Sequence, residues 1–498
     1  MNALKNENNY TYTENGAVTY KSTLNAVLDL FSLGGAYRVR SDVDVINLFK
    51  KAFEENETLA MKCLFYLRDV RGGQGERRFF RVVCKWLARE HTDAMRRNLG
   101  YVMEFGRYDD LYVFVGTPLE KDAFDLMYHQ LALDVQCKTP SLLAKWLKSE
   151  NTSSHESQML AKKTRQYFNM TSREYRKTLS ILRERIRVLE RLMSAGRWDE
   201  IEFDKIPSRA GLIYKNAFAR HDIERMKAGA AQSYEDFAKD KNTKVNAEAL
   251  YPYEVVERAF RAARKPLDDT DRLMVNKYWD GLRDVMNGYA FNGLAIADVS
   301  GSMSGTPMNV AISLAMYCAE HAKGPYANHF FTFSARPQFV EVQGVDFVDK
   351  VYRIEHADWG MNTNIEAVFD MVLRIAVENH LRQDEIPQNL IVLSDMEFDA
   401  CACDNTNSAG RWSVSCIKNK ETLFETIEKR WKRAGYTLPR LTFWNLSARQ
   451  DNIPMRADAH VNYVSGFSQN IFDSVMKGLD AYDLMLDKLN SERYACIR

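Results

Sequence analysis

The feature that most constrains the fold of this chain is an apolar run that ends abruptly in oxygen-bearing side chains. Residues 291–302 read FNGLAIADVSGS, so Asp298, Ser300 and Ser302 directly follow a strand-like segment. One carboxylate and two hydroxyls at positions i, i+2 and i+4 suit a hard divalent cation such as Mg²⁺, which takes few protein carboxylates and keeps open coordination positions. The same residue types also form strand-end caps and turns. The pattern therefore indicates either a metal site or a polar turn.

Strand-like apolar runs alternate with helical segments after about residue 286. The expected strands are Leu294–Ala297, His329–Phe333, Asn389–Leu393, Arg440–Trp444 and a short His460–Val464. The expected helices are Met308–His321, Ile365–His380, Glu421–Ala434 and a closing helix over Asn470–Leu489. This alternation predicts a doubly wound, Rossmann-type α/β domain with a mostly parallel sheet, in which ligands bind at the carboxyl ends of the strands. Asp298 and Asp395 both follow strands at that edge.

Residues 20–280 have a different pattern, because their apolar side chains recur with the 3.6-residue period of helices. Glycines and prolines divide this part into segments of roughly 12–25 residues, a usual size for packed helices. No strict repeat is visible, which favours an irregular helical array of the solenoid kind. We therefore expect a multidomain protein, with an all-α domain over residues 1–285 and an α/β domain over residues 286–498.

Charge is distributed unevenly along the 498 residues, although the formal net charge is only +1. Residues 1–280 carry 47 Lys and Arg against 40 Asp and Glu, whereas residues 281–498 carry 21 against 27. An anionic partner would therefore meet the front part of the chain. Long apolar runs and a secretory signal are both missing, so we expect a cytoplasmic protein without a membrane partner. Eight scattered cysteines do not resemble a disulfide framework.

Two further oxygen-bearing residues follow in an order that suits the same metal site. Thr363 precedes an expected helix, and Asp395 follows the third expected strand. The series DxSxS, threonine and aspartate resembles the metal-ion-dependent adhesion site of von Willebrand factor A domains. This resemblance implies a Mg²⁺ held by Ser300, Ser302 and Thr363, directly or through water, with Asp298 and Asp395 bound to the ion or to its ligands. It also implies an open coordination position for an acidic side chain of a protein partner.

Two groups of basic residues in the helical part are candidates for contacts with nucleic acid. The candidate RNA-binding residues are Arg71, Arg77, Arg78, Arg81, Lys162, Lys163, Arg173 and Arg176. The first group surrounds the turn at residues 72–75, GGQG, whose backbone amides could hold a phosphate beside the arginines. Interleaved aromatic side chains, such as Trp146, would stack on bases of a single strand. The same aromatics also fit a helical core, and the arginines fit solvated helix faces paired with glutamate.

The order of the two parts carries a second resemblance. A helical array followed by an A-type domain is similar to the TROVE-domain RNA-binding proteins, the Ro autoantigen family. The segments that carry this resemblance are 68–78 (RDVRGGQGERR) and 106–111 (GRYDDL), and they look closer still to the DUF2828 group, which 169–176 (NMTSREYR) and 206–210 (IPSRA) also fit. The resemblance implies a HEAT-like helical ring whose basic surface binds small structured RNAs or the ends of misfolded RNA.

The hypothesis from the sequence is a non-enzymatic RNA-binding protein. Basic helices would hold small or structured RNA, and the A-type domain would present Mg²⁺ to a protein partner that supplies an acidic ligand. The main alternative is a metal-dependent protein-interaction scaffold without nucleic acid. A nuclease that uses Asp298 and Asp395 with Mg²⁺ is a third possibility, although only two carboxylates converge and no general base is evident.

Overall fold

The computed structural model describes residues 8–264, 269–286, 291–322, 325–333, 337–355, 364–399, 422–457 and 460–498. These residues form two compact units, each assembled from segments that are distant in the sequence. Unit 1 contains the described residues of Met1–Cys63, Tyr251–Pro266 and Leu282–Tyr494, and unit 2 contains those of Leu64–Leu250, Leu267–Gly281 and Ala495–Arg498. This grouping differs from a single division at residue 285, because the first 63 residues belong to the unit that contains the large sheet.

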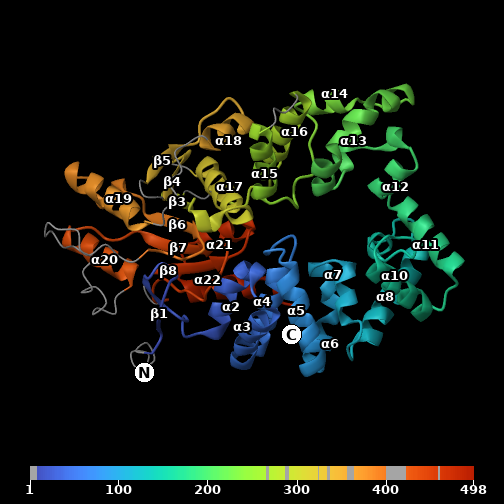
Figure 1. Cartoon of the computed structure of the whole chain (residues 1–498), viewed down its shortest axis with the longest axis horizontal. Coiled ribbons are helices and arrows are strands. Elements are labelled where there is room, and N and C mark those ends of the chain that lie inside the picture. Colours follow the sequence, from blue (N-terminus) through green and yellow to red (C-terminus); the bar gives the residue numbers. More distant parts are fainter. Residues whose placement is uncertain are drawn as a thin grey trace. The chain divides into compact units, whose positions relative to one another are not determined.

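Unit 1 is built around a six-stranded sheet with the order β5-β4-β3-β6-β7-β8 (Figure 1). The strands are β3 (Gly293–Asp298), β4 (His329–Phe333), β5 (Gln338–Glu341), β6 (Asn389–Ser394), β7 (Arg440–Asn445) and β8 (Val461–Ser465). Neighbouring strands are parallel, except that β5 runs antiparallel to β4 at the edge. The five expected strands are thus present as expected, and β5 is an addition that the sequence pattern did not reveal.

The central strands are buried on both faces, as the lack of polar alternation in their sequences predicts. Every residue of β3 and of β8 is buried.

The helices of unit 1 are α2 (Ala26–Leu33), α3 (Asp42–Glu55), α15 (Pro252–Arg264), α17 (Thr306–His321), α18 (Phe347–Glu355), α19 (Glu366–Glu378), α20 (Leu423–Arg433), α21 (Phe472–Val475) and α22 (Ala481–Leu489). The expected closing helix over Asn470–Leu489 is therefore two helices, and Gly478 between them has a φ of +64° that a helix does not allow.

The N-terminal residues of unit 1 begin with a hairpin of β1 (Tyr10–Tyr12) and β2 (Val18–Tyr20), where we had expected only helices. Tyr20 also forms an antiparallel bridge with Ile453. Helix α2 follows and packs against β8. These contacts explain why the start of the chain belongs to the unit of the sheet.

Unit 2 consists of helices and turns, and its described residues form no strand. Its main helices are α5 (Arg77–Glu90), α6 (Thr92–Asn98), α7 (Val102–Phe105), α8 (Glu120–Gln136), α9 (Leu143–Trp146), α10 (His155–Tyr167), α11 (Ser172–Arg185), α12 (Leu189–Ser194), α13 (Ser208–Lys227), α14 (Tyr234–Lys239) and α16 (Asp269–Asp280), while α4 (Glu57–Arg68) contributes to both units. Local sequence signals mark where these helices begin and end. Thr171 and Glu174, for example, form a reciprocal capping box at the start of α11. Among the described residues, no helix is both long and apolar enough to cross a bilayer.

Candidate functional site

The carboxyl ends of β3 and β6 bring the first polar residues of the candidate metal site together. In the parallel register Ala297 lies opposite Leu393, so Asp298 and Ser394 are the next neighbours across the two strands. The Ser394 hydroxyl donates a hydrogen bond of 2.6 Å to Asp298 Oδ2. Both side chains are fully buried. The carboxylate of Asp298 is therefore fixed in place at the edge where ligands bind in such sheets.

The turn after β3 brings the two serine hydroxyls beside this carboxylate. The backbone N–H of Ser300 donates to Asp298 Oδ1 at 2.9 Å, which fixes the direction of the turn. The Ser300 and Ser302 hydroxyls form a hydrogen bond with each other, and their oxygens lie 3.0 Å apart. Two adjacent ligands of an octahedral Mg²⁺ at about 2.05 Å from the ion are separated by about 2.9 Å. The hydroxyl pair therefore has the spacing of two neighbouring ligands of one magnesium ion.

Asp395 supplies a second buried carboxylate to the same edge. It is only 1 % exposed. Burial and the nearby negative charge of Asp395 together raise the pKa of Asp298 to about 7. Two such carboxylates in a water-poor site favour a bound cation, because a cation would remove their repulsion and replace lost hydration. In this respect the residues present fit a divalent metal, which would supply a positive charge and an open position for an anionic ligand.

A guanidinium group already supplies part of that positive charge. Arg449 donates from Nη2 to Asp395 Oδ2 at 2.8 Å and from Nη1 to Glu14 Oε2 at 2.8 Å. Arg449 lies in the loop after β7, and no sequence motif marks it. The metal pattern identified Asp395 but did not reveal that this carboxylate has an arginine partner.

The N-terminal hairpin also contacts this edge of the sheet, through a hydrogen bond to Glu397. The backbone N–H of Glu14 donates to Glu397 Oε2 at 2.7 Å, and Asn452 donates to Glu397 Oε1 at 2.8 Å. Burial raises the pKa of Glu397 to about 7. The Thr13 hydroxyl and the Asn15 amide add hydrogen bonds to the backbone of the same loop. Hydrogen bonds between residues nearly 400 positions apart in the chain thus fix Glu397 and Phe398 beside the N-terminal hairpin.

Of the five candidate metal ligands, four lie in the described part of the chain and converge at this edge. Thr363 lies outside the described residues. Among the described residues, no cluster of three or more His, Cys, Asp or Glu side chains could hold a metal. A metal at this edge would therefore rely on hydroxyl oxygens as well as on carboxylates, as the DxSxS pattern implies.

The first group of candidate RNA-binding residues lies at the start of α5 and, in the case of Arg71, in the turn before it. Arg77 forms an ion pair with Asp109, and Arg81 donates to Asp110 Oδ1 at 2.6 Å. Asp110 also accepts two hydrogen bonds from the buried Arg68, at 2.7 and 3.0 Å. Much of the positive charge in this group is thus used inside unit 2. Of the other two members, Arg71 is exposed and Arg78 is partly exposed.

The glycine-rich turn beside these arginines is a structural turn. The backbone N–H groups of Gln74, Gly75 and Glu76 donate to the carbonyls of Tyr66, Asp69 and Leu67, respectively. A Cβ atom on Gly73 would lie 1.9 Å from the Tyr66 carbonyl oxygen. Glycine is therefore required for close packing at this turn, and these three amides are engaged within the chain rather than turned toward a phosphate.

The second group of candidates lies on α10 and α11. Lys162, Arg173 and Arg176 are exposed, and Lys163 pairs with Glu120 at 2.6 Å. Residues 162–191 contain ten Lys and Arg against three Asp and Glu. Unit 2 as a whole contains 37 Lys and Arg against 30 Asp and Glu. The surplus of basic residues in this segment is therefore as large as the surplus in the whole unit.

A helical region combined with a six-stranded mixed sheet places the protein among multidomain proteins with helical and α/β parts. The chain belongs to the DUF2828 family, which confirms the family expected from the sequence. The family model, "Domain of unknown function (DUF2828)", matches residues 13–141 and 129–287, and a second, "Domain of unknown function (DUF7788)", matches residues 292–492. A relative from Acanthamoeba polyphaga mimivirus, "Uncharacterized protein L728", is 31% identical over 506 residues, which cover 94% of this chain and 85% of the relative.

Proposed function

We propose that this protein is a non-enzymatic RNA-binding protein of the TROVE type, in which unit 2 binds small or structured RNA. The observation that carries this proposal is the concentration of basic charge in residues 162–191. Three of its cations, Lys162, Arg173 and Arg176, are exposed on two consecutive helices. Phosphate groups are attracted to such a surface, and their release of counterions makes the binding sensitive to salt.

Unit 1 would add a Mg²⁺-dependent module of the von Willebrand factor A kind. The support for this part is the Ser300–Ser302 hydroxyl pair beside Asp298 and Asp395. A bound Mg²⁺ would offer an open coordination position to a carboxylate of a protein partner. Such a module holds a partner without chemical change, in keeping with a non-enzymatic role.

The test of RNA binding is a gel shift of the full-length protein with a small hairpin RNA at low and high salt. Reversing the charge at two exposed positions, Lys162→Glu with Arg173→Glu, should weaken binding about 10-fold or more, and the affinity of the wild type should fall with added salt. The control is Arg374→Glu, which reverses an exposed charge on α19 of unit 1 and should leave binding unchanged. Equal affinity of all three proteins at low salt would contradict the proposal.

The alternative function is a metal-dependent protein-interaction scaffold that binds no nucleic acid. Two observations favour it: the ligand-like spacing of the Ser300 and Ser302 hydroxyls, and the use of Arg77 and Arg81 in internal ion pairs. Pull-down from nuclease-treated extract, with Mg²⁺ or with EDTA, separates the two functions. Protein partners that stay bound after nuclease treatment and are lost with EDTA would support the scaffold. RNA that copurifies without nuclease treatment, and stays bound in EDTA, would support RNA binding.

A further inference from the structure

Unit 2 contains a hollow beside Trp146 that combines an aromatic ring with several cations. It has a volume of about 590 Å³, within the range of about 300–1,000 Å³ that is usual for ligand sites. Helices α9, α11 and α12 and the loop after α9 line it. Its charged lining consists of four basic residues and two acidic ones, namely Lys145, Arg176, Arg183, Arg191, Glu150 and Glu190.

The charge of this pocket favours an anion. Glu150, one of its two acids, is already held by Arg165 at 2.8 Å and by the Ser172 hydroxyl. A larger hollow in the same unit, of about 1460 Å³, is lined by five basic and five acidic residues and has no comparable preference. Of these two hollows, the pocket beside Trp146 is therefore the better fit for phosphate groups.

The four cations of the pocket comprise a structural one, Arg183, a partly exposed one, Lys145, and two exposed ones. Arg183 donates to the carbonyls of Ala144 and Leu147 and to the Ser149 hydroxyl, so it fixes the end of α9. Arg176 and Arg191 are exposed. Arg176 donates a hydrogen bond to a carbonyl of its own helix and lies near the Glu150 carboxylate, and Arg191 forms a 3.6 Å ion pair with Glu184. These two guanidinium groups can therefore turn toward a ligand at little cost.

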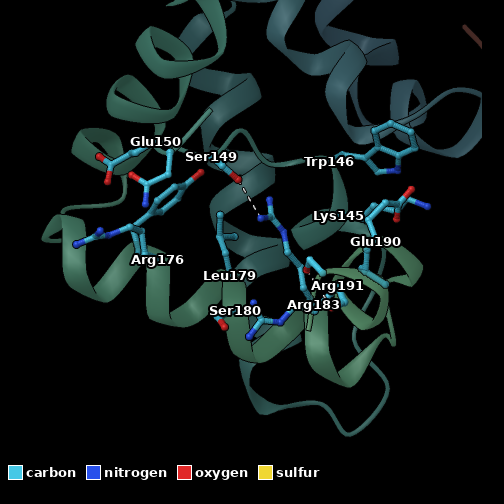
Figure 2. A pocket seen from close by; sticks show the side chains of 14 residues that line it. Lys145, Trp146, Ser149, Glu150, Arg176, Leu179, Ser180, Arg183, Glu190 and Arg191 are labelled. Carbon is cyan, nitrogen blue, oxygen red and sulfur yellow. Dashed lines mark hydrogen bonds between the residues drawn. The ribbon is translucent and has the colours of Figure 1, made fainter. Parts of the chain in front are cut away.

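Basic residues lie on both sides of the pocket, and Trp146 lies on one of them. Figure 2 shows Trp146 and Lys145 on one side and Glu150 and Arg176 on the other, with Arg183 between them. The guanidinium of Arg107 lies 4.7 Å from the centre of the Trp146 ring, which holds the ring in place. A base stacked on Trp146 would thus have Lys145 beside it, and Arg183 and then Arg176 further across the pocket, where the phosphates of a strand that crosses it would lie.

From this arrangement we infer that the pocket binds an unpaired nucleotide within a single strand of RNA. The base stacks on Trp146, and the flanking phosphates are held by Arg176 and Arg191. A base inside a duplex cannot reach an aromatic ring in this way, because its faces are covered by its neighbours. This inference rests on the proposed RNA binding and adds to it a preference for unpaired bases.

The test measures the affinity of full-length protein for three probes: a single-stranded oligouridylate, the same length of abasic ribose-phosphate chain, and a blunt RNA duplex. The wild type should bind the oligouridylate more tightly than the other two. Trp146→Ala should weaken oligouridylate binding roughly 5- to 150-fold, the range expected for loss of one stacked base, and should leave binding of the abasic chain unchanged. Unchanged abasic binding also shows that the variant is folded.

Two matched variants complete the test. Trp198→Ala removes a partly exposed tryptophan of the same unit that lies outside the pocket, where it stacks on His221, and it should have no effect. Trp146→Phe should restore most of the affinity. Arg176→Ala should weaken binding of every strand more than Arg173→Ala does, because both arginines are exposed on α11 but only Arg176 lines the pocket.

The outcomes separate this inference from the proposed function. Wild-type protein that binds none of the three probes would contradict RNA binding itself. Two results would contradict the role of the pocket: wild-type protein that binds all three probes equally, or an equal loss of oligouridylate affinity in Trp146→Ala and Trp198→Ala. Either result would leave only a general attraction for phosphate.

Discussion

Arg449 and Asp395 form an ion pair of 2.8 Å at the carboxyl edge of the sheet. The carboxylate is buried and the arginine is about one-third exposed. Arg449 thus neutralises one of the two buried carboxylates of the candidate metal site, whereas Asp298 accepts hydrogen bonds from the Ser300 backbone N–H and the Ser394 hydroxyl. The ion pair gives Asp395 a protein partner, and Asp298 and the serine hydroxyls are the groups that a metal would contact.

Removal of this arginine should make the protein depend more strongly on a metal. Arg449→Met would leave Asp395 buried without its partner, and we expect a loss of about 2 kcal/mol in the free energy of unfolding in EDTA. Added Mg²⁺ should restore more stability to this variant than to the wild type. Thermal unfolding with EDTA and with MgCl₂ measures both effects. Arg374→Met, at an exposed position of α19, is the control, and an equal Mg²⁺ effect in all three proteins would rule out the coupling.

Loss of the hydroxyl ligands should abolish the response to metal. We expect Mg²⁺ to raise the melting temperature of the wild type, because a ligand that binds only the folded state stabilises it. Ser300→Ala with Ser302→Ala, or Thr363→Ala alone, should remove that shift. Ser304→Ala should keep it, since the Ser304 hydroxyl donates to the carbonyl of Gly301 within the turn. A shift that survives in the double variant would place the metal elsewhere.

The buried charge cluster of unit 2 should control its stability in acid. Burial alone would raise the pKa of Asp110, but Arg68 and Arg81 outweigh this effect and hold that pKa below its ordinary value. A carboxyl with a lowered pKa stabilises the fold above about pH 4 and loses this contribution as the pH falls through its folded-state pKa. Asp110→Asn should therefore cost about 3 kcal/mol near pH 7 and less near pH 3.

Urea unfolding at several pH values measures the difference between the two proteins. The control is Asp125→Asn, which disrupts an exposed pair with Lys121 and should cost less than about 1 kcal/mol. A cost of Asp110→Asn that stays constant from pH 7 to pH 3 would show that the charge of the carboxylate is not the stabilising feature.

The glycine turn before α5 should tolerate no side chain at its second position. Gly73→Ala would force a Cβ atom against the Tyr66 carbonyl, and we expect a loss of at least about 3 kcal/mol in the free energy of unfolding. Gly100→Ala is the matched control in the same unit, because no atom lies within 4 Å of the Cβ that it would add. Equal stability of the two variants would show that the turn can open without cost.

The sequence was sufficient where the signal is local. Apolar runs and helical periodicity predicted the five strands β3, β4, β6, β7 and β8 and the helices α17, α19 and α20 but not α18, because strand and helix periods are read from neighbouring residues. The positions of Asp298 and Asp395 followed from the rule that ligand-binding residues come after parallel strands. The edge strand β5 and the N-terminal hairpin were missed, since short segments carry little periodic signal.

Only the tertiary structure decided which charges meet. Arg449 reaches Asp395 from 54 positions away, and Glu14 reaches the same arginine from the opposite end of the chain. Arg77 and Arg81 were predicted to face RNA, but folding places Asp109 and Asp110 beside them. Local order is encoded in the spacing of residues along the chain, whereas the partner of a charge depends on which distant segments fold against it. The sequence by itself therefore determined most of the elements, the family and the edge of the sheet where the candidate metal site lies, and the fold determined how the charges around that edge and in unit 2 are paired.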